Sequence, residues 1–311
     1  MLQSRSLGTT DVTVSHISFG CASIANLYAR VTDKAAQDVL SYAWLRGIRY
    51  FDTAPHYGRG LSETRLGQFL QTVPKNEVTL SSKVGRVLTP GKQRSEADGF
   101  VSPLPNDVRY DYSGAGIMES FEGSLERLGV DHLDIVYVHD IGKLTHGADN
   151  DRHMEDLLST GLPALERLKV AGKIGAYGLG VNECEVCVDV MKHHTLDVIL
   201  LAGRWTLLDR SAEKELIPLC QQANTSLVLG GIFNSGILAT GAKEGAHFDY
   251  APASEEILAK TRALEQECLR DGIPLATAAM QFGFSKDIVA SVLLGTGKVS
   301  SLARNLDALK L

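Results

Sequence analysis

The feature that most constrains the fold of this chain is a regular alternation of short apolar runs with longer segments of helical periodicity. Such alternation predicts a parallel sheet in which each strand is followed by a helix. Eight strands are expected, at residues 17–20, 50–52, 78–83, 135–139, 174–180, 198–202, 227–230 and 292–294. Helices are expected near residues 33–46, 62–70, 116–128, 156–171, 183–193, 212–223, 254–271, 274–285 and 300–309. Eight such units predict an α/β fold of the (β/α)8 TIM barrel type.

The composition fits one large domain. The chain has 311 residues, 44% of them hydrophobic and 22% charged, and no change in composition divides residues 1–311. A formal net charge of −6 without a concentrated lysine or arginine stripe argues against nucleic acid as a partner. The first residues lack a basic leader followed by an apolar run, and no stretch of about 18 apolar residues occurs elsewhere. We therefore expect a cytoplasmic protein with no membrane partner, either a monomer or a small homo-oligomer.

The five cysteines are an odd number in a large chain, which fits reduced thiols better than a disulfide framework. Cys184 and Cys187 form one CxxC pair, and His193 and His194 follow it. A zinc site would need a second pair of ligands, and the segment itself has a helical pattern. We expect the two cysteines to pack on a helix and expect no metal.

Three further segments fall outside the alternation. Residues 3–14 have the pattern of a hairpin, which we expect to close the bottom of the barrel. Residues 85–113 follow the third strand and carry prolines, glycines and aromatic side chains, so we expect them to cover a substrate. Residues 234–253 contain several glycines and follow the seventh strand, where we expect a flap over a cofactor.

Four polar residues stand at or just beyond the ends of three consecutive strands. Asp52 ends the second strand, Lys83 the third and His139 the fourth. Tyr57 lies five residues after Asp52, beyond a Thr-Ala-Pro sequence that stops the strand. Because the carboxyl ends of barrel strands meet at the face where barrel enzymes carry out chemistry, we expect these four side chains to lie together.

This set of side chains suits proton transfer coupled to hydride transfer. A free phenol has a pKa of about 10 and is a poor acid or base at neutral pH. We expect the ammonium group of Lys83 to lower the pKa of Tyr57, and Asp52 to keep that ammonium charged. His139 would hydrogen-bond the reacting oxygen. The expected reaction is hydride transfer at an alcohol or carbonyl carbon, with Tyr57 as the acid or base.

These four residues, with Gly178-Leu179-Gly180-Val181-Asn182 and the late Leu294-Gly295-Thr296 … Asn305 segment, resemble the aldo-keto reductase superfamily over nearly the whole chain. The chain is similar to its branch of D-threo-aldose (L-fucose) and L-galactose 1-dehydrogenases and pyridoxal 4-dehydrogenase. The resemblance implies a catalytic tetrad and a nicotinamide cofactor, and no GxGxxG motif follows the first strand. The residues implied to bind the cofactor are Asn182, Gly231, Phe233, Ser235, Gly236, Gly295, Thr296, Gly297, Lys298, Ser301 and Asn305.

Three positions near the expected nicotinamide depart from the family pattern. Val181 replaces the serine that usually precedes the carboxamide-binding asparagine, and Ala202 replaces the usual glutamine of the sixth strand. Gly230 stands where an aromatic residue usually stacks on the nicotinamide. We expect either Trp205 or Phe233 to provide that surface instead.

A fourth departure concerns the choice between NAD and NADP. Ser301 stands where NADP-specific relatives have an arginine, although Lys298 and Arg304 lie nearby. The loss of a bidentate cation for the 2′-phosphate favours NAD, with NADP possible.

The activity implied by the resemblance is oxidation of the anomeric carbon of an aldose of the L-fucose, L-galactose or D-threo-aldose type to the aldonolactone. Three alternatives stay open: oxidation of pyridoxal to 4-pyridoxolactone, aldehyde reduction in the opposite direction, and a cofactor-binding subunit without catalysis. The candidate contacts with a small sugar or pyridoxal substrate are Trp205, His56 and the polar residues Arg86, Arg94, Asp98, Asn106, Asp107 and Arg109.

Overall fold

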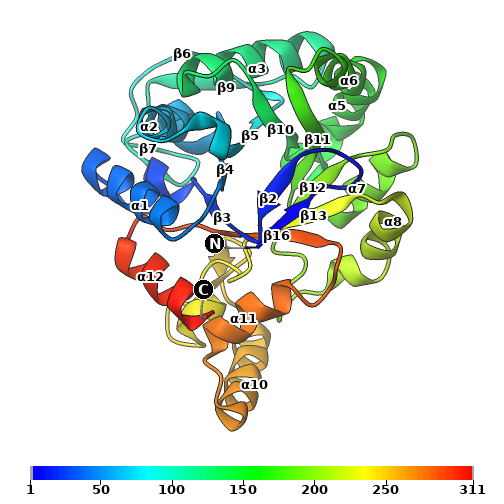
Figure 1. Ribbon diagram of the computed structural model, residues 1–311. Helices are drawn as coiled ribbons and strands as arrows, with labels where there is room; N and C mark the ends of the chain where they lie inside the picture. Colours follow the sequence, from blue (N-terminus) through cyan, green and yellow to red (C-terminus); the bar gives the residue numbers. More distant parts are fainter. Residues whose placement is uncertain (1–2, 310–311) are drawn as a thin grey trace.

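The computed structural model describes residues 3–309 of the chain. Eight parallel strands close into a barrel in the order β10-β11-β12-β13-β16-β3-β4-β5, and Figure 1 shows the helices as a ring around them. The predicted (β/α)8 barrel is confirmed. Its strands are β3 (Ile17–Gly20), β4 (Tyr50–Asp52), β5 (Thr79–Val84), β10 (Leu133–His139), β11 (Ile174–Val181), β12 (Val198–Ala202), β13 (Ser226–Gly230) and β16 (Val289–Leu294).

Each of the predicted helices is present. Several begin at a capping side chain, as Ser254 does by accepting a hydrogen bond from the Ile257 amide at 3.3 Å. The helices are α1 (Asp33–Leu45), α2 (Leu61–Leu70), α3 (Gly114–Leu128), α4 (Lys143–His146), α5 (Asn150–Asp156), α6 (Leu162–Val170), α7 (Cys184–Met191), α8 (Leu216–Ala223), α9 (Ile237–Thr240), α10 (Glu255–Asp271), α11 (Leu275–Gly283) and α12 (Val299–Ala308).

The helix predicted at 156–171 is interrupted by a π-helical turn and is continuous with α5, and the helix predicted from 212 begins later than predicted. A π-helical turn, Leu157–Gly161, precedes α6, because Pro163 has no N–H for the bond that an α-helix would need at that position. The α8 helix begins at Leu216, which places Pro218 in its first turn, where a missing N–H is tolerated.

Apolar side chains fill two layers of the barrel. The inner layer includes Tyr50, Tyr137 and Leu200, and the outer layer packs the strands against the helices. The hairpin of β1 (Ser4–Ser6) and β2 (Thr13–Ser15) adds Leu7 and Val14 to the inner layer. The prediction that this hairpin closes the bottom is confirmed. A hollow of about 790 Å³ at that end contains none of the predicted site residues.

The two long connections after β5 and β13 contain strands that the sequence pattern did not predict. The first forms the hairpins β6 (Arg86–Pro90) with β9 (Asn106–Tyr110) and β7 (Glu96–Ala97) with β8 (Phe100–Val101). The second forms the hairpin β14 (His247–Phe248) with β15 (Ala251–Pro252).

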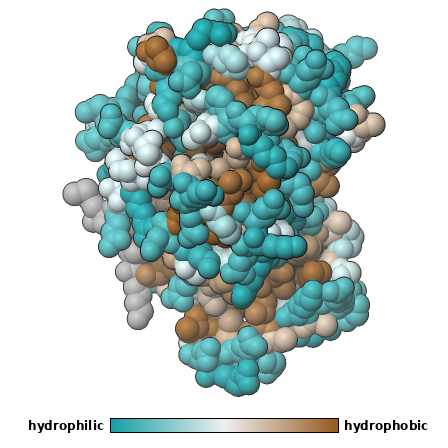
Figure 2. Space-filling view, turned by 90° about the vertical axis from the view of Figure 1, so that its right-hand side faces the viewer, coloured by the Kyte–Doolittle hydropathy of each residue, from teal (hydrophilic) through white to brown (hydrophobic). Residues whose placement is uncertain are grey.

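The outer surface is mostly polar in the view of Figure 2, where hydrophobic residues gather in the hollows between hydrophilic ones. Within residues 3–309, no helix is both long enough and apolar enough to cross a membrane.

Candidate active site

The four predicted catalytic side chains lie together at the carboxyl-terminal face of the barrel. Asp52 is the last residue of β4, and His139 is the last of β10. Lys83 is one residue from the end of β5, and Tyr57 begins a 3-10 turn on the loop after β4. One cavity of about 460 Å³ is lined by Tyr57, Lys83, His139, His56 and Asn182. Asp52 lines a neighbouring cavity.

Lys83 and Asp52 form an ion pair inside the barrel, with 2.7 Å between Nζ and Oδ2 and with both side chains buried. Lys83 also donates to the Thr53 carbonyl at 2.8 Å, and the Ser81 hydroxyl donates to the other oxygen of Asp52 at 2.7 Å. Buried charges need such partners, because an unpaired charge is costly to remove from water. The pair fixes the ammonium group of Lys83, whose Nζ lies 4.8 Å from the centre of the Tyr57 ring.

The Tyr57 phenol has a raised pKa in this site. Burial raises the pKa well above its ordinary value, the carboxylates of Asp52 and Asp140 raise it further, and the guanidinium of Arg86 acts in the opposite direction. The expected lowering of the Tyr57 pKa by Lys83 is therefore wrong for the free protein. The charge of Lys83 is balanced by Asp52 at 2.7 Å, so it does not overcome the cost of burying a phenolate. Tyr57 is consequently protonated at neutral pH.

Two histidines beside Tyr57 are held neutral. Burial, together with Arg86 and Lys83, lowers the pKa of His139 well below its ordinary value, and burial lowers that of His56 to about 2. The His139 ring stands edge-on to Tyr57, with 5.8 Å between ring centres. Its Nε2 lies 3.4 Å from a carboxylate oxygen of Asp140, which only accepts, so we assign the proton of the neutral ring to Nε2. An oxygen of a bound molecule would have to replace or share this Asp140 contact to accept that proton.

A second, partly buried ion pair was missed by the sequence analysis. Arg86, at the start of β6, lies 2.5 Å from the carboxylate of Asp140, which directly follows His139. Asp140 lines the cavity and has a φ of 43°, which is uncommon for a residue other than glycine. Arg86 was predicted as a sugar contact, but nothing in the local pattern pairs two residues that lie 54 positions apart.

A second cavity, of about 330 Å³, shares Tyr57 with the first and extends toward the loop after β13. The backbone of that loop is left-handed at Asn234, Ser235 and Gly236, with φ values of 43°, 57° and 98°. The buried Oδ1 of Asn234 has no hydrogen-bond partner among residues 3–309. Such an acceptor suits a hydroxyl-bearing group such as a ribose. The predicted cofactor residues that line the cavity are Gly231, Phe233, Ser235, Gly236 and Gly295.

The other predicted cofactor residues continue from Gly295 toward α12. The Lys298 amide donates to the Thr296 hydroxyl at 3.1 Å, and α12 begins at the next residue. A helix N-terminus of this kind favours an anion such as a phosphate. The residues in this segment lie outside both cavities and are Thr296, Gly297, Lys298, Ser301 and Asn305.

Trp205 lies away from both cavities, which corrects its prediction as a substrate contact. Its side chain is 2% exposed and packs against Phe282, with 4.9 Å between ring centres. Of the two predicted stacking surfaces for a nicotinamide, Phe233 lines the second cavity and Trp205 does not. The indole belongs to the apolar core between the barrel strands and the helices.

The 85–113 connection contributes fewer polar contacts to the cavity than predicted. Arg94 pairs with Asp107 at 2.5 Å, and Arg109 pairs with Glu119 at 2.6 Å, so these charges hold the hairpins to each other and to α3. The residues of this connection that line the cavity are Asp98, Gly99 and Phe100. The cavity is also lined by Leu27, Tyr28 and Tyr250, which the sequence analysis did not single out.

Cys184 and Cys187 belong to the apolar core on α7, as predicted for packing residues. The Cys184 sulfur lies 3.8 Å from the Ser211 hydroxyl, and the Cys187 thiol donates to the Glu183 carbonyl at 3.4 Å. Among residues 3–309, no group of three or more histidine, cysteine or acidic side chains is arranged to hold a metal ion.

Comparison with known proteins identifies the relatives of this chain. Residues 16–311 match the Aldo/keto reductase family. The chain is 41% identical to pyridoxal 4-dehydrogenase of Microbacterium luteolum, over 98% of this chain and 92% of that protein. It is 36% identical to D-threo-aldose 1-dehydrogenase of a Pseudomonas species, over 94% and 88%. A holo aldo-keto reductase structure from Bacillus halodurans superposes with a TM-score of 0.74 at 26% identity, over 100% and 92%.

The position of Trp205 generates a prediction. Trp205→Ala should lower the free energy of unfolding by about 3–5 kcal/mol, because it leaves a cavity in the core. Trp205→Phe, which keeps a ring against Phe282, should leave the Michaelis constant for the substrate unchanged. Denaturant unfolding and steady-state kinetics measure the two effects, with Phe100→Ala as the matched change inside the cavity. A raised Michaelis constant in Trp205→Phe, at an unchanged free energy of unfolding, would show that Trp205 does contact the substrate.

Proposed function

We propose that this chain, which belongs to the aldo/keto reductase family of oxidoreductases, is a nicotinamide-dependent dehydrogenase. The proposed reaction oxidises the carbinol carbon of a cyclic hemiacetal to a lactone. The observation that carries this proposal is the shared cavity of Tyr57, Lys83, His139 and Asn182. It adjoins a second cavity that the glycine-containing loop after β13 lines. The proposed proton carrier, Tyr57, thus lies where the cavity proposed for the substrate adjoins the cavity proposed for the dinucleotide.

Tyr57 is the proposed proton carrier. In oxidation its phenolate takes the proton of the hemiacetal hydroxyl, the C–H bond of the same carbon breaks with its electron pair, and the C=O bond of the lactone forms. A bound nicotinamide supplies the acceptor for that hydride. His139 donates from Nε2 to an oxygen of the substrate, and the Lys83–Asp52 pair holds the ammonium against Tyr57. Because Tyr57 is protonated in the free protein, oxidation requires its proton to leave first, whereas aldehyde reduction does not.

The proposed cofactor is NAD. Asn182, from the first cavity, would hold the carboxamide, and Phe233, from the second, would offer the stacking surface. The left-handed loop from Asn234 to Gly236 would hold the pyrophosphate. The segment from Gly295 to Asn305 would hold the adenosine end, at the N-terminus of α12. Ser301 offers a hydroxyl where a bidentate cation would be needed to bind a 2′-phosphate tightly.

Pyridoxal and aldoses are both cyclic hemiacetals, and the cavity favours pyridoxal. Its walls carry the aromatic side chains of Tyr28, Phe100 and Tyr250, which suit a flat ring. The relative at 41% identity is a pyridoxal 4-dehydrogenase. An aldose of the L-fucose or D-threo type is the second candidate, because the carboxylates of Asp98 and Asp140 in the same cavity accept hydrogen bonds from hydroxyl groups.

Turnover tests this proposal directly. Pyridoxal and a panel of aldoses, each with NAD and with NADP, are followed at 340 nm, and the product is identified as a lactone by mass spectrometry. Tyr57→Phe keeps the ring and removes the hydroxyl, so the turnover number should fall by about 10²–10⁴ while the cofactor still binds. Near-normal turnover in Tyr57→Phe would remove Tyr57 from the mechanism. Cofactor binding without turnover of any hemiacetal or aldehyde would favour the non-catalytic alternative.

Cofactor choice gives a second prediction. NAD should bind more tightly than NADP to the native protein, and Ser301→Arg should narrow or invert the difference, because arginine supplies a bidentate phosphate contact. Isothermal titration calorimetry measures both affinities without turnover. Ser301→Gln, a long uncharged side chain, is the control and should leave the preference for NAD in place. Tighter binding of NADP to the native protein would show that Lys298 or Arg304 provides the cation.

A further inference from the structure

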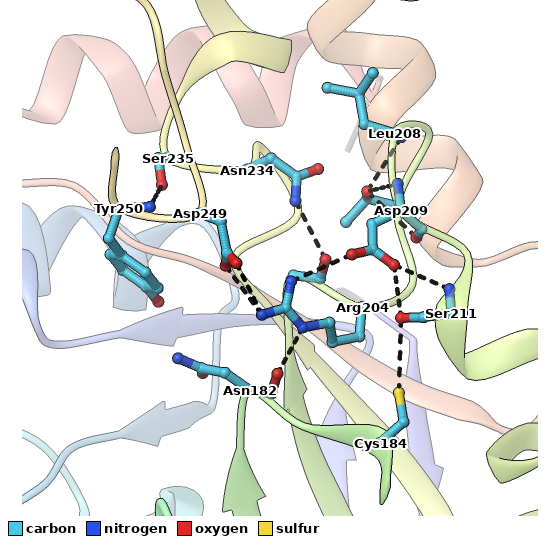
Figure 3. Close-up of polar contacts among 12 residues, drawn as sticks. Asn182, Cys184, Arg204, Leu208, Asp209, Ser211, Asn234, Ser235, Asp249 and Tyr250 are labelled. Atoms are coloured by element: carbon cyan, nitrogen blue, oxygen red, sulfur yellow. Dashed lines mark hydrogen bonds and ion pairs between the residues drawn. The ribbon is translucent and has the colours of Figure 1, made fainter. Parts of the chain in front are cut away.

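Arg204, on the turn after β12, joins three separate segments of the chain (Figure 3). Its Nε donates to the main-chain carbonyl of Asn182 at 2.5 Å, and its Nη1 donates to Asp209 at 3.2 Å. Its Nη2 lies 3.0 Å from both carboxylate oxygens of Asp249. The Arg204 side chain is 12% exposed, so these contacts hold a largely buried cation between two carboxylates.

The three partners of Arg204 have different places in the fold. Asn182 follows β11 and lines the first cavity, the one that also contains Lys83 and His139. Asp209 lies in the turn after β12 and is itself fixed, since the Ser211 hydroxyl donates to it at 2.6 Å. Asp249 lies in the turn of the β14–β15 hairpin. The guanidinium of Arg204 therefore connects Asn182, the residue proposed to bind the cofactor, with the β14–β15 hairpin.

Tyr250 follows Asp249 and reaches the boundary between the two cavities. It lines both of them, although 61% of its surface is exposed. The backbone is left-handed at both residues, with φ values of 50° and 65°, which is unfavourable for non-glycine side chains and needs outside support. Arg204 gives that support at Asp249, and the Ser235 hydroxyl accepts a hydrogen bond from the Tyr250 amide at 2.9 Å. In Figure 3 the Tyr250 ring points down from the hairpin toward the side of the site where Asn182 lies.

We propose that Arg204 is a positioning residue whose contacts link Asn182 to the β14–β15 hairpin, a link called the tie below. Tyr250, which the tie holds in place, is a specificity-determining residue at the boundary between cofactor and substrate. The inference rests on the proposed function for the identity of the two ligands. Fixing Asn182 through its own carbonyl orients its side-chain amide, and fixing Asp249 keeps the Tyr250 ring over the opening. Loss of the tie therefore weakens cofactor binding and frees the hairpin, whereas loss of the ring alone changes the substrate that is accepted.

The tie is tested first without turnover. Arg204→Lys keeps the charge but loses the planar fork that reaches three partners, and Asp249→Asn removes only the hairpin's carboxylate. We expect both variants to speed tryptic cleavage after Lys243, an exposed residue of the same segment, by about tenfold or more in the cofactor-free protein. We expect Arg204→Lys to raise the dissociation constant for NAD by about tenfold, measured by calorimetry. Arg262→Gln is the matched control, because it removes an exposed ion pair with Glu255 on α10 and should change neither value.

The role of Tyr250 is tested by kinetics. Tyr250→Ala should raise the Michaelis constant for the substrate with a smaller change in turnover number, and Tyr250→Phe should restore it. Cleavage after Lys243 in Tyr250→Ala should stay close to the native rate, because the Arg204–Asp249 contact remains.

Two results would overturn the inference. If Arg204→Lys and Asp249→Asn both match Arg262→Gln in cleavage rate, and Arg204→Lys also matches it in NAD affinity, Arg204 does not tie the hairpin to the site. If Tyr250→Ala has native Michaelis constants for every substrate that is turned over, Tyr250 does not determine specificity. Cleavage and cofactor affinity are measured without substrate, so a protein that shows the Arg204 effects but oxidises no hemiacetal would keep the tie and refute the proposed function.

Discussion

The buried Lys83–Asp52 ion pair is the interaction on which the rest of the site depends. It is the end of a chain of hydrogen bonds that rises through the barrel, from Tyr137 to Tyr50 at 2.9 Å, from Tyr50 to Ser81 at 3.0 Å and from Ser81 to Asp52 at 2.7 Å. A charge inside an apolar barrel is tolerated only where its partners are fixed in advance. The barrel interior therefore holds the ammonium group in place before any ligand arrives.

The same pairing limits what the ammonium can do to Tyr57. Asp52 balances the charge of Lys83, the buried phenol keeps a raised pKa, and the neighbouring His139 is neutral. The charged groups at the free site are consequently paired, as Lys83 is with Asp52, Arg86 with Asp140 and Arg59 with Asp98. Such a site accepts an uncharged hemiacetal or aldehyde without burying an unpaired charge. It also favours proton donation by Tyr57 over proton removal near neutral pH, so alkaline conditions favour lactone formation.

The eight strands and the tetrad were predictable from sequence because both are encoded locally. A strand that is buried on both faces has a continuous apolar run, and the residues at its end lie at the carboxyl-terminal face of the barrel. Trp205 was predicted wrongly because its position depends on how the chain leaves β12. The Arg86–Asp140 and Arg204–Asp249 pairs were missed because their members lie 54 and 45 positions apart, on connections whose course no local pattern sets.

The state of the Tyr57 phenol is the most direct test of this account. In protein labelled with ¹³C at the tyrosine ζ carbon, the Tyr57 signal is assigned by its loss in Tyr57→Phe and followed through a pH titration without cofactor. The account predicts that this signal stays at the position of a protonated phenol beyond pH of about 10, the ordinary pKa of tyrosine, because burial outweighs the balanced charge of Lys83. An inflection between about pH 7 and 9 would contradict it, and would show that Lys83 activates Tyr57 in the free protein.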